Sequence, residues 1–315
     1  MGTESTHYEL ATLIRDEALR LGFSACGFAS VSDVDEVVYN RWQEWIACGK
    51  HDTMQYMERY ADVRSNPQSL LPEARTVISV ALNYYPAEAM PDENPRFARY
   101  AYGDDYHEII REKLQELSQY IQSLSPCWCR VCCDTAPIFE RYWAVQAGIG
   151  FIGRNSQLII PHRGSYFFLG ELLTTLPLPA TTTKHERLCG ECHRCVQACP
   201  VGAIGQDGTI DARLCISCQT IENRGELPSI VIERMGKRVY GCDTCQEVCP
   251  HNIHACPTTI KELQPHTEMK NLSYNRLKNL TKEEFQTIFR RSAIKRAKYE
   301  GLMRNITSLD PTLFE

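Results

Sequence analysis

The sequence predicts an α/β or α+β domain, followed by a ferredoxin-like module rich in cysteine and a helical C-terminal tail. Three observations indicate this order. Helical and strand patterns alternate over residues 1–183, ten of the 16 cysteines fall within residues 184–256, and residues 257–315 carry 11 lysines and arginines against 7 acidic residues. A chain of 315 residues that is 43% hydrophobic can bury a large core. We therefore expect three parts, residues 1–183, 184–256 and 257–315.

The first part alternates between the two periodicities. Apolar residues share one helical face over residues 10–21, which ends at Gly22, and further helices are predicted at residues 42–46, 107–124 and 137–147. Strands are predicted at residues 23–28, 76–82, 131–133, 156–160 and 166–173. The run at 76–82 is continuously apolar, which is typical of a strand in a sheet that is covered on both faces. Helices that alternate with buried strands imply an α/β domain.

The composition favours a cytoplasmic protein with no membrane partner. No apolar run approaches the roughly 18–20 residues of a membrane helix, and the N-terminus has no apolar signal region before Arg15 and Asp16. Disulfides are rare in a reducing compartment, so the 16 cysteines need another explanation. The net charge of −5 gives no support to bulk nucleic-acid binding.

The spacing of one cysteine run indicates an iron–sulfur cluster. Cys189, Cys192, Cys195 and Cys199 follow the order C-x2-C-x2-C-x3-C and are succeeded by Pro200. This is the bacterial ferredoxin arrangement for [4Fe–4S] clusters, in which the fourth cysteine binds the other cluster. Zinc also uses C-x2-C pairs, but it seldom uses three cysteines at this spacing followed by Cys-Pro.

A second run repeats the pattern without its first cysteine. Cys242, Cys245 and Cys249 are followed by Pro250, and either Cys215 or Cys218 must complete the set. Crossed ligation predicts two clusters. The first would take Cys189, Cys192, Cys195 and Cys249; the second would take Cys199, Cys242, Cys245 and one of the remote pair.

Two clusters beside a large domain indicate single-electron transfer to a substrate or acceptor. Asp134 follows a predicted strand and precedes a helix, which is where α/β proteins build sites, so its carboxyl could donate a proton. Helix capping by Asp134 or Thr135 explains the same residues. The group Cys127–Cys133 is interpreted as a buried strand, with a third metal site as the alternative.

Basic residues of the tail stand near helical spacing. They are Arg290, Arg291, Lys295, Arg296, Lys298 and Arg304. Such a stripe could follow the phosphates of a nucleic acid, or it could be a solvated helix face.

Several segments together resemble the epoxyqueuosine reductase family, whose members complete the queuosine modification of tRNA. The matching segments are residues 70–75, 102–107, 134–141, 147–155, 189–200, 213–217 and 240–246. The resemblance covers essentially the whole chain. Many members continue into a helical-repeat domain, whereas this sequence stops at Glu315, and Cys218 and Cys256 match no ligand position.

The resemblance implies a cofactor set and roles for single residues. It implies base-off cob(II)alamin beside two [4Fe–4S] clusters, with Cys215 as the remaining ligand and Asp134 as the proton donor to the epoxide oxygen. It suggests cofactor contacts from Arg64, Ala98, Asp134, Asn155, Leu158, Leu169, Ser217, Gly241 and Cys242. The cobalamin signature Asp-x-His-x-x-Gly is missing at Asp105-Tyr106-His107, so no lower histidine ligand is expected.

The implied partners are the anticodon stem-loop of a tRNA that carries epoxyqueuosine and an external low-potential electron donor. Two other functions remain open at this point. One is a corrinoid reductive dehalogenase, although such enzymes usually carry a twin-arginine signal that the sequence lacks. The other is a non-catalytic iron–sulfur electron-transfer partner.

Overall fold

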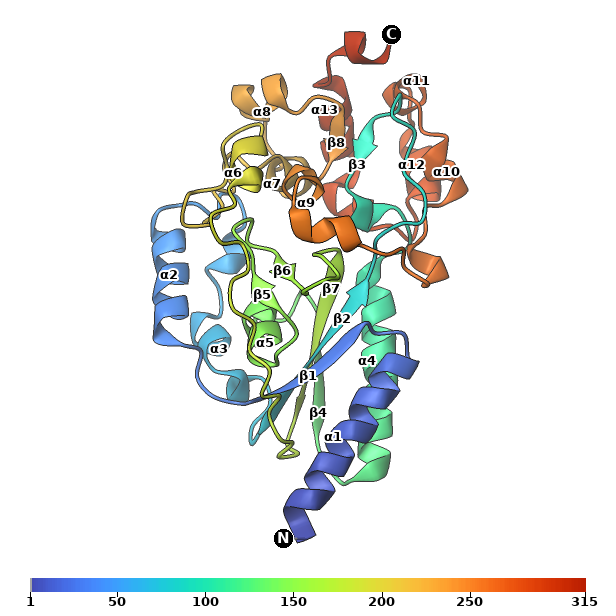
Figure 1. Ribbon diagram of the computed structural model, residues 1–315. Helices are drawn as coiled ribbons and strands as arrows, with labels where there is room; N and C mark the ends of the chain where they lie inside the picture. Colours follow the sequence, from blue (N-terminus) through green and yellow to red (C-terminus); the bar gives the residue numbers. More distant parts are fainter. Residues whose placement is uncertain (1) are drawn as a thin grey trace.

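A four-stranded antiparallel sheet forms the centre of the N-terminal half (Figure 1). The computed structural model describes residues 2–315. The strand order is β1 (Ala25–Ser30), β2 (Thr76–Asn83), β7 (Phe167–Thr174) and β4 (Cys129–Cys132), and every neighbouring pair is antiparallel. The predicted alternation of helices and strands is confirmed, but the sheet is antiparallel, so the arrangement is α+β rather than that of a parallel α/β domain.

Helices cover the two faces of this sheet. α1 (Gly2–Arg20) and α4 (Tyr106–Leu124) lie on one face, and α5 (Glu140–Gln146) packs on the other, with α2 (Glu36–Ala47) and α3 (Ala61–Ser65) beyond it (Figure 1). The side chains of β2 alternate between two cores. Ile78, Val80 and Leu82 pack toward α4, while Val77 and Ala81 pack toward α5. The prediction of a strand buried on both faces is confirmed.

Of the cysteines before Asp134, Cys129 and Cys132 lie in the edge strand β4, and Cys127 and Cys133 lie just outside its two ends. Cys132 and Cys133 are buried, whereas Cys127 and Cys129 are half-buried and Trp128 is 71% exposed. The predicted buried strand is therefore correct only at its C-terminal end. The first half is uncovered because β4 has a neighbour on one side only.

The cysteine module consists of short elements around the thiols. It contains α6 (Arg194–Ala198), α7 (Ile216–Ile221), α8 (Ser229–Arg234), β8 (Arg238–Tyr240) and α9 (Thr244–Glu247). β8 pairs in parallel with β3 (Arg96–Phe97), and a second small ribbon joins β5 (Phe151–Ile152) to β6 (Leu158–Ile159). No helix within residues 2–315 is long and apolar enough to cross a membrane.

The tail packs into the same core as the cysteine module. Its helices are α10 (Thr267–Lys270), α11 (Tyr274–Lys278), α12 (Lys282–Ile288) and α13 (Lys298–Thr307). Phe289, Leu302 and Ile306 are fully buried in one cluster with Val239 and Tyr240 of β8. The tail is therefore part of the wall that encloses the cysteines.

The predicted basic stripe does not exist as one helical face. Residues 290–292 form a turn, Lys295 and Arg296 lie in the 3-10 helix η6 (Ala293–Ala297), and Arg304 lies on α13. Arg296 pairs with Glu222 at 2.7 Å, and Arg304 donates to backbone carbonyls of the module. A turn, a 3-10 helix and an α-helix follow one another here, so residues at helical spacing in the sequence do not lie on one helical face in the structure.

Asn305 joins the tail to the module through a fully buried amide. Its Nδ2 donates to the carbonyls of Thr220 (2.8 Å) and Val239 (2.9 Å). We expect Asn305→Ala to lower the free energy of unfolding by about 2–3 kcal/mol, because two buried carbonyls lose their donor. Urea unfolding monitored by circular dichroism measures this. The matched control is Asn279→Ala, whose amide is exposed, and an equal loss in both variants would contradict the assignment.

Candidate functional site

The cysteines of the first run lie close to Cys249 of the second run. Burial raises the pKa of the Cys249 thiol, and the neighbouring charges of Cys189, Cys195 and Cys192 raise it further. Cys249 therefore lies beside a loop that is more than fifty residues away in the sequence. The short helices α6 and α9 pack against each other and bring these two segments together.

The remaining thiols form a second neighbourhood. Burial raises the pKa of Cys215, and the charges of Cys242 and Cys199 add to this; the pKa of Cys245 is raised by burial and then by Cys242 and Cys215. Cys218 has a different environment. Burial and the charge of Cys215 raise its pKa most, and the remaining charges that raise it belong to the carboxylates of Asp52 and Glu222. Cys218 thus faces carboxylates, and Cys215 is the thiol that faces the other cysteines.

The chemistry and spacing of these donors suit four-iron clusters. Zinc requires sulfurs at about 2.3 Å from one ion. No three histidine, cysteine or acidic side chains lie close enough to hold a single metal ion anywhere in the described residues 2–315. The two neighbourhoods of cysteine thiols and their C-x2-C-x2-C-x3-C-P spacing suit [4Fe–4S] clusters, which bind through four cysteine thiolates each.

Backbone amides and one arginine hold the cluster loops in place. The N–H of Arg154 donates to Cys189 Sγ (3.4 Å), and the N–H of Ala203 donates to Cys199 Sγ (3.3 Å). The Arg154 guanidinium donates to the carbonyls of Gly190 (2.9 Å), Cys192 (3.1 Å) and Gln206 (3.0 Å). Arg154 lies in the turn between β5 and β6, so the N-terminal domain clamps the first cysteine loop directly.

An acid–base group lies at the end of β4. Asp134 has φ +51°, a left-handed conformation that costs a non-glycine residue about 1 kcal/mol. Its Oδ2 lies 2.8 Å from His107 Nε2, and His107 Nδ1 lies 2.7 Å from Asp105 Oδ1. Asp105 also caps α4 by accepting from the N–H of His107. The imidazole is thus held between two carboxylates.

These two carboxylates keep His107 protonated near neutral pH. Burial alone would lower the pKa of the imidazole, but the hydrogen bonds to Asp105 and Asp134 outweigh it and raise the pKa to about 9. The side chain of Asp134 is 54% exposed, so its second oxygen can reach a bound molecule. Protonated His107 therefore lies next to the solvent-accessible carboxylate of Asp134.

Two further carboxyl groups stand behind Asp134. Glu140 accepts a hydrogen bond from the backbone N–H of Asp134 (2.5 Å), and burial together with the Asp134 charge raises its pKa to about 7. Glu171 of β7 is fully buried, and burial followed by the charge of Glu140 raises its pKa well above the usual range. Ser79 donates to one of its oxygens (3.1 Å), and the other has no partner among the described residues.

Five of the predicted corrin contacts, Ala98, Asn155, Ser217, Gly241 and Cys242, lie beside or within the second thiol group. Gly241 precedes Cys242 and packs so closely on Ala98 that an added Cβ would stand 2.5 Å from the Ala98 Cβ. Asn155 is buried and donates to the carbonyl of Cys245 (3.3 Å). Ser217 lies on α7, two residues after Cys215. The packing of Gly241 on Ala98 and the bond from Asn155 to Cys245 join the N-terminal domain to the cysteine module.

The other predicted contacts lie on the N-terminal domain. Leu158 and Leu169 pack in the core on the α5 face of the sheet. Arg64 is buried on α3, where its guanidinium donates to the carbonyls of Arg59 and Tyr56 (3.4 Å each). The charge of Glu140 acts on Arg64, which places Arg64 near the acid–base group rather than beside the thiols.

His107, Glu140 and Glu171 are functional candidates to which the sequence analysis assigned no role. A charged residue inside the apolar run 166–173 was one signal for Glu171. His107 gave only a weak signal, because the contact between α4 and the end of β4 is not visible in a local pattern.

Comparison with known proteins identifies the family. Residues 64–135 match the family described as epoxyqueuosine reductase QueG, DUF1730, and residues 188–252 match a 4Fe–4S double cluster binding domain. The epoxyqueuosine reductase of Cellulophaga algicola is 37% identical over 312 residues, which is 98% of this chain and 100% of the relative. The chain belongs to the epoxyqueuosine reductase family. The resemblance inferred from the sequence motifs is thereby confirmed. The prediction that the chain is an iron–sulfur oxidoreductase of tRNA modification is confirmed as well.

Solved epoxyqueuosine reductases share the whole fold. One was crystallised with an epoxyqueuosine-modified tRNA stem loop; it has a TM-score of 0.87 and 30% identity, and the match covers 96% of this chain and 81% of that one. The Bacillus subtilis enzyme, in which a catalytic loop that carries an aspartate is swung out of the active site, has a TM-score of 0.88 and 29% identity, with the same shares covered.

The clamp formed by Arg154 leads to a prediction about iron content. We expect Arg154→Gln to lose most of the first cluster, because two hydrogen bonds to its loop and one to the neighbouring turn at Gln206 disappear, so that iron falls from about eight to about four atoms per chain. Colorimetric iron analysis of anaerobically purified protein measures this. Arg187→Gln, an exposed arginine near the same loop, is the control and should keep its full iron content.

The raised pKa of His107 leads to a prediction about pH. A raised folded-state pKa means that the stabilisation is complete below about pH 6.5 and is lost as the pH rises toward about 9. We expect the Tm of the wild type to fall over this window by several degrees more than that of His107→Gln. His162→Gln, at an exposed turn, should behave like the wild type. Parallel curves for wild type and His107→Gln would contradict the assignment.

Proposed function

We propose that the chain reduces the epoxide of epoxyqueuosine at the wobble position of tRNA to the alkene of queuosine, using cobalamin and two [4Fe–4S] clusters. The observation that carries the proposal is the chain of contacts Asp105–His107–Asp134, which ends in an exposed carboxylate within a family of epoxyqueuosine reductases. The relative solved with a modified tRNA stem loop supports the choice of substrate.

The proposed ligand sets follow the two thiol neighbourhoods. One cluster is held by Cys189, Cys192, Cys195 and Cys249, and the other by Cys199, Cys215, Cys242 and Cys245. The charge neighbours of Cys249, Cys215 and Cys245 support this division. The clusters would carry single electrons from an external donor toward the substrate site.

The residues that would hold cobalamin come from both parts of the chain. Ala98, Leu158, Leu169 and Gly241 offer small or apolar surfaces, and Asn155, Ser217 and Arg64 offer polar groups. The bond between Asn155 and the Cys245 carbonyl supports a site against the second thiol group. When bound, the corrin would supply the low-potential cobalt centre that reduces the epoxide carbon.

Asp134 and His107 would supply a proton to the oxygen that leaves carbon. Opening the epoxide and losing that oxygen as water consumes two electrons and two protons. As the C–O bond breaks, Asp134 would relay a proton to the epoxide oxygen: His107 Nε2, 2.8 Å away, gives its proton to the Asp134 carboxylate, which passes it on. His107 then remains neutral and keeps its Nδ1–H bond to Asp105, and water supplies the second proton.

Exposed cations of the tail would contact the tRNA backbone. Arg290, Lys295 and Lys298 are exposed, and no ion pair holds them in the described part of the chain. Arg296, held by Glu222, stacks its guanidinium 5.6 Å from the centre of the Tyr56 ring. The charges of Asp134 and Arg296 both act on Tyr56, so this edge of the tail lies near the proposed proton donor.

The test is Asp134→Asn in the holoenzyme. We expect bound iron and cobalamin to be unchanged, and conversion of epoxyqueuosine in tRNA to fall by at least about 100-fold, because the amide cannot donate the proton. Nucleoside mass spectrometry measures the product. Asp33→Asn, on an exposed loop before α2, is the control. Turnover of Asp134→Asn close to that of the control would refute the role of Asp134.

A further inference from the structure

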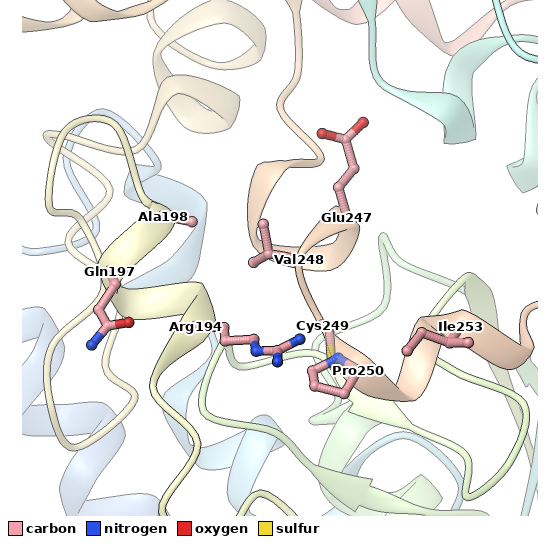
Figure 2. A pocket seen from close by; sticks show the side chains of 8 residues that line it. All are labelled: Arg194, Gln197, Ala198, Glu247, Val248, Cys249, Pro250 and Ile253. Atoms are coloured by element: carbon pink, nitrogen blue, oxygen red, sulfur yellow. The ribbon is translucent and has the colours of Figure 1, made fainter.

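A hollow on the outer surface of the cysteine module lies directly over Cys249 (Figure 2). It has a volume of about 530 Å³ and is formed by residues of α6 on one side and by the segment from α9 into the 3-10 helix η4 (Pro250–His254) on the other. Cys249 is part of its lining, and the charges of Cys189, Cys192 and Cys195 act on this thiol. A molecule seated there would approach the first thiol group from outside.

The lining is apolar around an exposed isoleucine. Ile253 is 76% exposed, and Val248, Pro250 and Ala198 line the same hollow. A large aliphatic side chain in a concave surface is typical of a contact site, whereas a lone one on a convex surface needs no explanation.

The helix that presents Ile253 is held rigidly. The neighbouring Asn252 accepts from the N–H of Ser165 (2.7 Å) and donates to the carbonyl of Gln246 (2.7 Å). At Gly164, an added Cβ would stand 2.2 Å from the Asn252 side chain. A surface that is already ordered costs little to bring into a complex.

The charge at the hollow is positive where it borders Cys249. Figure 2 shows the Arg194 guanidinium beside Cys249 and Pro250. Arg194 forms no ion pair in the part of the chain that the structure describes, whereas Glu247 on the opposite side is held at 2.7 Å by Arg99, which also pairs with Asp243. An unpaired guanidinium beside an apolar rim favours a partner with carboxylates around an apolar contact.

We propose that this hollow is the docking site of a small one-electron carrier protein with an acidic face. This inference rests on the proposed function, which needs two electrons per epoxide. A one-electron carrier must dock, give one electron to the first cluster, leave oxidised and be replaced by a second reduced copy. Such exchange requires a small and short-lived interface, and electron-transfer complexes are of this kind.

The position of the hollow allows docking while the substrate is bound. None of its lining residues belongs to the acid–base group of Asp105, His107 and Asp134 or to the exposed cations of the tail. The carrier's site would therefore share no residue with the proposed proton donor or with the tail cations.

The experiment compares two pairs of variants of the cluster-loaded protein. Arg194→Glu and Ile253→Asp alter the hollow, while Arg234→Glu and Ile232→Asp make the same changes on α8, where Arg234 is exposed and Ile232 is 42% exposed. A reduced acidic [2Fe–2S] ferredoxin is mixed with each variant, and cluster bleaching is followed by stopped-flow absorbance. We expect the second-order rate constant to fall about tenfold for each hollow variant, with a weaker salt dependence for Arg194→Glu, and to stay within about twofold for the α8 variants.

Two further measurements complete the test. Titanium(III) citrate should reduce all four variants alike, and biolayer interferometry should show weaker binding of oxidised ferredoxin only for the hollow variants. Equal rates and equal binding in both pairs would overturn the proposal. If the hollow substitutions slowed reduction of the clusters by free reduced flavin but not by ferredoxin, the proposal would be overturned in favour of a small-molecule site. These readouts need neither tRNA nor cobalamin, so they stand whether or not the proposed function fails.

Discussion

The structure depends on the approach of Cys249 to the cysteine loop that begins at Cys189. This contact brings together two runs that are far apart in the sequence, and burial, with the charges of neighbouring cysteines, raises the pKa values of the Cys195 and Cys249 thiols. Several thiolates in one buried space would repel each other, so the raised pKa values favour the neutral thiols, and a bound cluster would supply the positive charge that lets them ionise. The neighbouring parts of the chain pack around this contact. Arg154 clamps the first loop from the N-terminal domain, and the tail closes the core around β8.

The N-terminal domain and the cysteine module serve different parts of the proposed chemistry. The sheet ends at Asp134, whose left-handed backbone points a carboxylate at solvent while His107 holds a proton behind it. The module places its second thiol group against Asn155 and Ala98 of the same domain. In the proposed reaction, the proton would come from the end of β4 and the electrons from the cysteine module, so different elements of the fold would serve the two supplies.

The sequence predicted what depends on local spacing. The C-x2-C-x2-C-x3-C-P run, the continuous apolar strand 76–82 and the periodicity of 107–124 gave the iron–sulfur module and most elements of the sheet domain. It failed where distant segments decide. The antiparallel order places β7 between β2 and β4, the tail cations are separated by a 3-10 helix, and His107 meets Asp134 only across the end of the sheet. The signal for Glu171 was present as one charge in an apolar run, but its unpaired oxygen is a property of the packed sheet.

The most direct test of the account is conversion by the purified protein itself. The chain is reconstituted anaerobically with iron, sulfide and cobalamin, given titanium(III) citrate as reductant and tRNA that carries epoxyqueuosine, and the digested nucleosides are analysed by mass spectrometry. The account predicts queuosine, lighter by one oxygen atom than its precursor, in an amount that exceeds the enzyme many times over. Intact epoxyqueuosine after reduction of both clusters and binding of cobalamin would contradict it.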